Sequence, residues 1–189
     1  GGRVMSTKYL RVRNLEIDSE LVMAMKPCWS REGVEQYLPP GTSLRIEEII
    51  ESEYISHSEK LWLVANILTN DQIFKVRQKF ITMADGYLLP YIEKYEGKDT
   101  KFWRTGLSWI NFYRLWWALQ NHYMKVIPYD SKKHPSYSDY MEEYEKSTFT
   151  SIWKAVRNLK VHPVSEWTRA YYIELYMSQP GIWGRYAHS

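Results

Sequence analysis

The chain has 189 residues, of which 44% are hydrophobic and 25% are charged, and its formal net charge is +3. This length can bury a real core, and this balance is typical of a globular chain rather than a disordered one. A charge so close to neutral permits an acidic partner without requiring one. We therefore expect a single globular domain spanning 5–189, with residues 1–4 ahead of Met5 taken as a cloning remnant.

Two features of the composition bear on location. Cys28 is the only cysteine, so no intramolecular disulfide can form, and we expect a half-buried structural thiol in a reducing compartment, the cytoplasm. No apolar run approaches the roughly 18 residues that a membrane helix needs. The richest run, Trp109 to Leu119, is interrupted by Asn111 and Arg114. We expect no membrane partner.

The aromatic content is unusual, with 16 Tyr and 9 Trp. These side chains combine a large apolar area with one polar atom, which suits both half-buried positions and contact surfaces. One interpretation is a core built from aromatic rings in place of Leu and Val. The other is a surplus of rings that the core cannot hold and that contacts a partner.

Only the stretch from Tyr9 to Ile17 has strand character, because apolar and polar residues alternate along it. The alternation slips at Asn14. This predicts one short strand or an irregular extended arm.

Helical signals dominate the rest of the chain. Capping residues, proline breaks and apolar residues spaced by three or four mark the predicted helices. The first two are a turn at 21–26 before Pro27 and a short helix at 30–38 before Pro39-Pro40-Gly41. Three helices with candidate caps follow: one capped by Ser43, one by Ser56 with Glu59, and one by Thr69 with Gln72 that meets Pro90. The last three are a long helix at 100–127, a helix with apolar residues from Met141 to Leu159, and a helix from Pro163 to Met177. The pattern predicts an all-α fold, a single orthogonal or bundle-like helical domain with a short extended N-terminal arm.

The predicted helix at 100–127 is apolar on nearly all faces. In a globular chain such a helix is either the central buried helix or part of an interface. Tryptophan, tyrosine and arginine are also the residues that dominate binding hot spots. We therefore take the densest cluster of them as candidate protein-binding residues, which are Trp103, Arg104, Trp109, Arg114, Trp116 and Trp117. Self-association through this helix, giving a homo-oligomer, is left open.

The sequence carries no catalytic or cofactor motif that we recognise. None of the five histidines has another His or the Cys within four residues, the spacing typical of metal sites. No glycine-rich phosphate loop and no Gly-x-Ser-x-Gly elbow occurs. Adjacent acids such as Glu142 and Glu143 point about 100° apart on a helix and make no shared site. We expect no metal, no cofactor and no enzymatic activity, with an enzyme lacking local motifs as a further alternative.

Nucleic-acid binding is an alternative function, and it needs cations that neutralise phosphates. Lys154, Arg157 and Lys160 are spaced by three and would share one stripe of a helix. Basic residues in the last turns of a helix are also what the helix dipole favours. The 22 acids that offset the 25 bases weaken this interpretation.

One segment resembles a known family. The run Leu68-Thr69-Asn70-Asp71-Gln72, followed by Ala84, by Leu89-Pro90-Tyr91-Ile92-Glu93-Lys94-Tyr95 and by Lys98-Asp99, is similar to the helical immunity proteins of bacterial toxin systems. The resemblance covers residues 68–99 only. The chain departs from the family at Phe102-Trp103-Arg104, where a Pro-Arg pair and an Ala-rich helix would follow. The resemblance implies an all-α fold and a non-enzymatic protein that binds and blocks a toxin.

The sequence thus predicts a non-catalytic helical interaction protein that binds and blocks another protein. It would act as an immunity-type inhibitor of a toxin or as a phage-type inhibitor of a host factor. Blockage would be steric, through an aromatic patch with basic residues at its rim.

Overall fold

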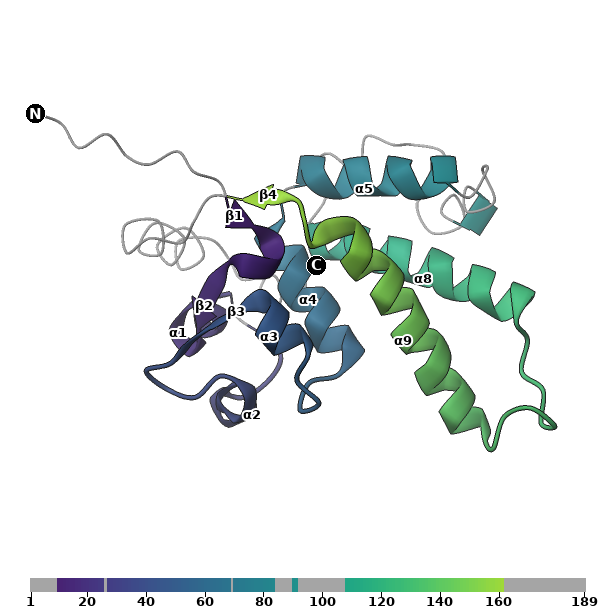
Figure 1. The fold of residues 1–189 in the computed structure, drawn as a ribbon, viewed down its shortest axis with the longest axis horizontal. Helices are drawn as coiled ribbons and strands as arrows, with labels where there is room; N and C mark the ends of the chain where they lie inside the picture. Colours follow the sequence, from purple (N-terminus) through teal and green to yellow (C-terminus); the bar gives the residue numbers. More distant parts are fainter. Residues whose placement is uncertain (1–9, 26, 69, 84–89, 92–107, 162–189) are drawn as a thin grey trace, which may run out of the picture. The chain divides into compact units, whose positions relative to one another are not determined.

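A computed structural model describes residues 10–25, 27–68, 70–83, 90–91 and 108–161 of the chain. These residues are mostly helical, with seven α-helices and four short strands among them (Figure 1). The predicted dominance of helix is confirmed, but the prediction missed two small sheets. The orthogonal or bundle-like arrangement stays a prediction. None of the described helices is both long enough and apolar enough to cross a membrane.

The chain divides into two compact units. Unit 1 combines Gly1–Ser56 with Arg157–Ser189, and unit 2 is the continuous stretch His57–Val156. The single domain spanning 5–189 stays a prediction. The predicted helix at 163–177 lies outside the described residues.

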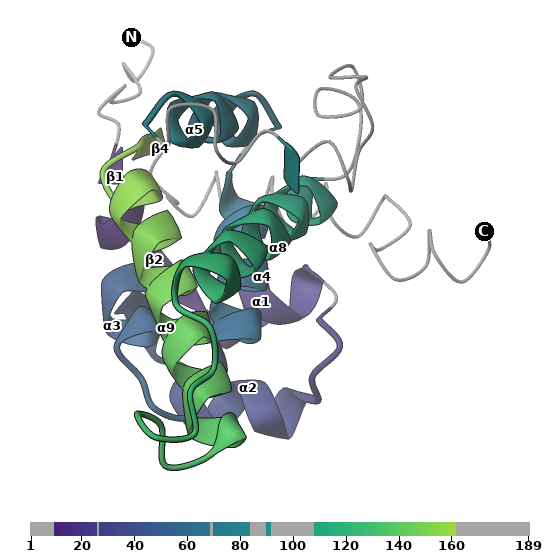
Figure 2. The ribbon, with the colours of Figure 1, turned by 90° about the vertical axis from the view of Figure 1, so that its right-hand side faces the viewer.

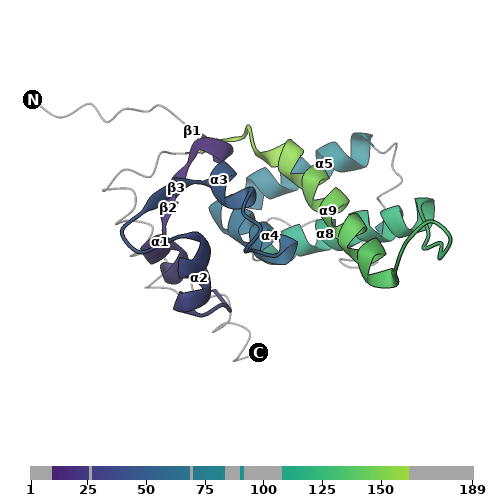
Figure 3. The same ribbon diagram turned by 60° about the horizontal axis from the view of Figure 1, so that its bottom comes forward.

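The strands of unit 1 form two antiparallel pairs. β1 (Leu10–Arg11) pairs with β4 (Lys160–Val161), and β2 (Glu16–Asp18) pairs with β3 (Ser43–Arg45). A 3-10 turn at Val12–Asn14 separates β1 from β2, at the point where the alternation slips. Figure 3 shows the three strands β1, β2 and β3 of this unit, coloured in chain order. The predicted extended arm is therefore two strands, each paired with a segment distant in sequence.

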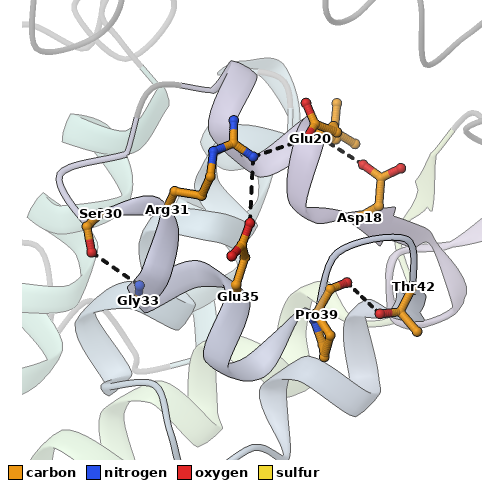
Figure 4. A network of polar contacts seen from close by, with 9 residues as sticks. Asp18, Glu20, Ser30, Arg31, Gly33, Glu35, Pro39 and Thr42 are labelled. Carbon is orange, nitrogen blue, oxygen red and sulfur yellow. Dashed lines mark hydrogen bonds and ion pairs between the residues drawn. The ribbon is translucent and has the colours of Figure 1, made fainter.

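The short helices of unit 1 begin at side-chain caps. α1 (Ser19–Ala24) is capped by Asp18, whose carboxylate accepts from the N–H of Leu21 at 2.9 Å. α2 (Arg31–Tyr37) is capped by Ser30, whose hydroxyl accepts from the N–H of Gly33 at 3.2 Å (Figure 4). Both helices stop before the prolines that were expected to end them.

Arg31 joins these two helices at the surface. Its guanidinium lies 3.1 Å from the Glu20 carboxylate and 3.8 Å from that of Glu35 (Figure 4). All three side chains are accessible to water, so each pair contributes about 0–1 kcal/mol.

The prediction that Ser43 caps a helix is wrong. Ser43 lies in β3 opposite Asp18, and the helix α3 (Ile46–Ile50) begins three residues later. Its first turn is anchored by two bonds, from the N–H of Ile46 to the carbonyl of Leu15 at 2.8 Å and from the N–H of Arg45 to the carboxylate of Glu48 at 2.9 Å. Pairing with β2 outweighs the local helical signal, because it satisfies the backbone while it buries Ile17.

The core of unit 1 is aliphatic. The side chains that are almost completely buried there are Val12, Leu15, Ile17, Leu21, Val22, Val34, Leu38, Ile46 and Ile49. Cys28 is exposed instead of half-buried, which corrects that expectation.

The regular elements of unit 2 in its described residues are all helices, joined by loops. It contains α4 (His57–Ile67), α5 (Asn70–Met83), α8 (Ser108–Val126) and α9 (Tyr137–Val156). The predicted starts after Ser56 and Thr69 are confirmed. α8 corresponds to the predicted helix at 100–127, of which residues 100–107 lie outside the description.

α8 is the central helix of unit 2. It contacts α4, α5 and α9, and Figure 2 shows α8 and α9 next to each other. Its buried side chains are Phe112, Leu115, Trp116 and Ala118, all at most 5% exposed. Of the two interpretations of this helix, a buried central position is confirmed for these residues.

The two candidate caps, Asp18 and Ser43, can be compared by mutation. Asp18→Ala should lower the free energy of unfolding by about 1 kcal/mol, because it removes the cap of α1. Ser43→Ala should cost less than about 0.5 kcal/mol, because its hydroxyl makes only a 3.4 Å contact with the Ile17 carbonyl. Urea denaturation of both variants measures the difference. A larger loss for Ser43→Ala would contradict the observed strand and restore the predicted helix.

Candidate functional site

The predicted aromatic cluster is only partly visible. Trp103 and Arg104 lie outside the described residues, and so does the side chain of Trp109. Arg114 is half-buried on α8. These positions neither support nor contradict a contact surface.

The two neighbouring tryptophans of α8 have opposite environments. Trp116 is 5% exposed and belongs to the core, whereas Trp117 is 49% exposed. Successive residues on a helix point about 100° apart, so burying one leaves the next outside. Of the two alternatives left open for Trp116, the core is observed, and Trp117 is the most exposed of the cluster residues whose side chains the structure describes.

Most of the exposed large apolar side chains fall in one segment of the sequence, which begins at Trp117. Six of the seven large apolar side chains that are exposed in the described residues lie between positions 117 and 137, and the seventh is Tyr54. We call the six the hairpin patch, because they come from the C-terminal half of α8, the following loop and the start of α9. They are Trp117, Met124, Val126, Ile127, Tyr129 and Tyr137.

Five of these six residues were not among the predicted binding residues. The predicted helix at 100–127 is apolar on nearly all faces, so its pattern did not distinguish an exposed side near its C-terminal end. A signal was present, since Val126 and Ile127 extend the apolar run up to a proline, where a helix usually ends. Because the helix buries only one face, apolar residues on several sides of its C-terminal end cannot all be buried.

A cluster of tyrosines holds the loop of the hairpin patch. Tyr140 is 1% exposed, and its hydroxyl donates to the carbonyl of Ile127. Burial raises the pKa of Tyr140, which keeps the hydroxyl protonated and able to donate. The Tyr129 ring packs against Tyr137 at 5.3 Å and Tyr140 at 5.6 Å, and against His134 at 5.9 Å. The exposed rings of Tyr129 and Tyr137 therefore pack against the buried ring of Tyr140.

Asp130 orders the backbone of the same loop. Its carbonyl accepts from the N–H groups of Lys133 at 3.0 Å and His134 at 2.9 Å, and its carboxylate accepts from the N–H of Lys132 at 2.9 Å. His134 also lies 3.5 Å from the carboxylate of Glu143 on α9. A loop tied at this many points loses little conformational entropy when it binds, which favours recognition.

The loop segment of the hairpin patch is rich in lysine, whereas the first turns of α9 carry the acids Asp139, Glu142 and Glu143. Between Trp117 and Tyr137 the chain carries three lysines, Lys125, Lys132 and Lys133, and only one acid, Asp130. All three lysines are exposed. The predicted aromatic surface with basic residues at its rim stays a prediction, and the hairpin patch shares only Trp117 with the residues expected for it.

A shallow groove adjoins the patch between α8 and α9. Its volume is about 160 Å³, and it is lined by Leu119, His122, Tyr123, Val126, Ile127, Ser147, Thr148 and Ser151. Thr148 is 3% exposed, and its hydroxyl has no hydrogen-bond partner. The groove can accept one side chain of moderate size beside the exposed Val126 and Ile127.

His57 and Lys60 form a second cluster of ionisable groups, on α4 against α9. The His57 ring lies 5.8 Å from Phe149, and its Nδ1 is buried without a partner. Burial lowers the pKa of His57, as do the nearby Lys60 and Lys146, while Glu142 acts in the opposite direction. Burial and Lys146 likewise lower the pKa of Lys60. Packing against α9 accounts for both shifts without a substrate.

The predicted basic stripe does not form on one helix. α9 ends at Val156, so Lys154 lies on the helix while Arg157 follows it and Lys160 is in β4. The expectation of a shared helical stripe is wrong, because the backbone leaves the helix to pair with β1. Arg157 and Lys160 belong to unit 1 and Lys154 to unit 2.

No group of three or more His, Cys, Asp or Glu side chains in the described part of the chain could hold a metal ion. The chain matches no protein-family model, and comparison with curated proteins and with solved structures finds no similar chain. Nine of the fifteen residues that carry the resemblance to the helical immunity proteins lie outside the described residues. The resemblance stays a prediction.

The neighbouring tryptophans give opposite expectations for stability. Trp116→Ala should lower the free energy of unfolding by about 3–5 kcal/mol, because it leaves a cavity in the core of unit 2. Trp117→Ala should cost about 1 kcal/mol or less, because half of that side chain is already in water. Thermal and urea unfolding of the two variants measure this. Equal losses would show that position 117 is structural and would remove it from the candidate surface.

The pKa of His57 predicts a dependence of stability on pH. Because the folded-state pKa is lowered from 6.5, the unfolded chain binds more protons between the folded value and 6.5. His57 therefore makes the folded state less stable as pH falls below about 6.5. His57→Phe should reduce the loss of stability between about pH 7 and pH 5, measured by urea denaturation at each pH.

Glu145→Gln is the matched control for this measurement. Burial raises the pKa of Glu145, so its carboxyl contributes a slope of the opposite sign. Its removal should make stability rise more steeply with pH. An unchanged pH profile in His57→Phe would show that this ring is hydrated in the folded state.

Proposed function

We propose that the chain is a non-catalytic protein that binds another protein through the hairpin patch and blocks it by covering its surface. The observation that carries this proposal is the concentration of six exposed apolar side chains between positions 117 and 137. Exposed apolar residues scattered singly need no explanation, whereas a group of them gathered in one segment of the chain is a candidate interaction site.

The chemistry of the patch favours a protein partner. Tryptophan, tyrosine and methionine are enriched in protein interfaces, and Trp and Tyr dominate binding hot spots. The ordered loop supports the same conclusion, since preorganised rings retain more of their contact energy on binding. The partner that fits is a protein surface with an apolar centre and acidic residues around it, because the rim of the patch carries Lys125, Lys132 and Lys133.

The proposal also includes a more specific function for this surface. An immunity-type inhibitor of a toxin, or a phage-type inhibitor of a host factor, would need a rigid contact surface and no catalytic group of its own. A cytoplasmic location and an all-α, bundle-like domain belong to the same proposal. A second copy of this chain is the competing occupant of the patch.

The proposal is tested with the double variant Trp117→Ala/Tyr137→Ala. We expect the wild-type chain to retain one partner from a lysate of its source, to inhibit the purified partner, and to lose both properties in the variant. Tyr54→Ala is the matched control, because Tyr54 is 77% exposed and aromatic but lies in unit 1. This control should bind as the wild type does.

Two outcomes would overturn the proposal. One is equal retention and inhibition by the double variant, with its fold verified by circular dichroism. The other is light scattering that shows a wild-type dimer and a monomeric double variant, because the patch would then join two copies of the chain.

A further inference from the structure

The pairing of β1 with β4 brings together two basic segments that are far apart in sequence (Figure 1). Arg11 lies directly opposite Lys160 in this antiparallel pair. Residues directly opposite each other project to the same face of a sheet, so these two side chains share a face. Just beyond them, the N–H of Arg13 donates to the carbonyl of Arg157 at 3.0 Å. We call these four residues the basic edge of unit 1.

The basic edge lacks acids in its own segments. Residues 1–15 and 157–165 together contain six Lys and Arg but neither Asp nor Glu. The other arginines described in unit 1, Arg31 and Arg45, each form ion pairs with two glutamates. The three arginines of the basic edge make no ion pair with any carboxylate of the described residues. Within the described part of the chain, no carboxylate therefore compensates the charges of these three arginines.

Hydrogen bonds and burial position the three arginines of the basic edge without an ion pair to a carboxylate of the described residues. The guanidinium of Arg11 donates to the carbonyl of Asn158 at 2.6 Å, which is a neutral acceptor. The Nε atoms of Arg13 and Arg157 are buried and have no hydrogen-bond partner. A guanidinium cannot lose its proton in a protein, so these charges persist at every working pH.

We propose that the basic edge binds the phosphate backbone of a nucleic acid. Bound phosphates would neutralise these positive charges, and the exposed side chain of Arg11 is the most accessible of the three arginines. The site differs from the predicted basic stripe, because it keeps Arg157 and Lys160, replaces Lys154 with Arg11 and Arg13, and is built on paired strands.

Phosphate is favoured over carboxylate for two reasons. Arginine is the preferred residue for phosphate and nucleic-acid recognition, and three of the four residues are arginines. The edge also lacks the large exposed apolar side chains that the core of a protein–protein interface requires, since the one such residue described in unit 1 is Tyr54. Contacts of this kind carry no sequence information, so we expect binding without strong sequence preference.

The test measures fluorescence anisotropy of a labelled DNA duplex, a single-stranded RNA of equal length and poly-glutamate, with the full chain. The wild type should bind the nucleic acids, and its affinity should fall steeply between about 50 and 200 mM salt. The triple variant Arg11→Gln/Arg13→Gln/Arg157→Gln should bind about tenfold more weakly or worse. Its slope of log affinity against log salt on duplex should be shallower by roughly 0.9 for each arginine that contacts a phosphate.

The matched control is Lys125→Gln/Lys132→Gln/Lys133→Gln, which removes the same charge from the hairpin patch in unit 2. This control should keep wild-type affinity and slope. If circular dichroism shows that the arginine triple variant is unfolded, Arg11→Gln alone replaces it, because that side chain is exposed. It should show the slope change of a single cation.

Three results would overturn the proposal. They are no nucleic-acid binding by the wild type at about 50 mM salt, equal weakening in the lysine control, and binding of poly-glutamate as tight as that of the nucleic acids. The last result would identify an acidic protein as the ligand. Because the two sites use different residues, failure here leaves the proposed protein-binding function untouched, and the reverse also holds.

Discussion

The burial of one face of α8 is the constraint on which the rest of unit 2 depends. Phe112, Leu115 and Trp116 each gain about 1.5–3 kcal/mol from being removed from water. A surface ion pair such as that of Arg31 with Glu20 contributes about 0–1 kcal/mol. Apolar packing against α4, α5 and α9 therefore sets the rotation of this helix about its axis. Once that rotation is set, Trp117 is directed away from the core.

The hairpin patch follows from this orientation together with a local anchor. α8 ends just before Pro128, and the chain must return to begin α9 at Tyr137. The buried hydroxyl of Tyr140 binds the carbonyl of Ile127, and the ring of Tyr140 supports that of Tyr129. One buried tyrosine thus connects the end of one helix, the loop and the start of the next. The exposed rings are held in place by contacts that exist before any partner arrives.

The two proposed surfaces rely on different forces and lie on different units. The hairpin patch combines apolar contact with a modest basic rim, so its binding should depend only moderately on salt. The basic edge acts through charge, so its binding should depend steeply on salt. A net charge of +3 conceals this segregation, because six of the 25 basic residues lie in two segments that contain no acid. Average composition argued against nucleic-acid binding, whereas the pairing of β1 with β4 concentrates the charge locally.

Local patterns in the sequence were enough to predict the start of a helix where a capping residue lies within one turn of it. The capping signatures at Ser56 and Thr69 predicted two helix starts correctly, because the groups that a cap satisfies lie within one turn. Local rules failed where a distant segment supplied the hydrogen bonds. Ser43 joined β2 instead of capping a helix, and Lys160 joined β1 instead of continuing α9. The candidate sites depended on tertiary structure for the same reason. Spacing showed that the helix at 100–127 was rich in aromatic residues, but only packing against three neighbouring helices decided that Trp116 is buried and Trp117 is exposed.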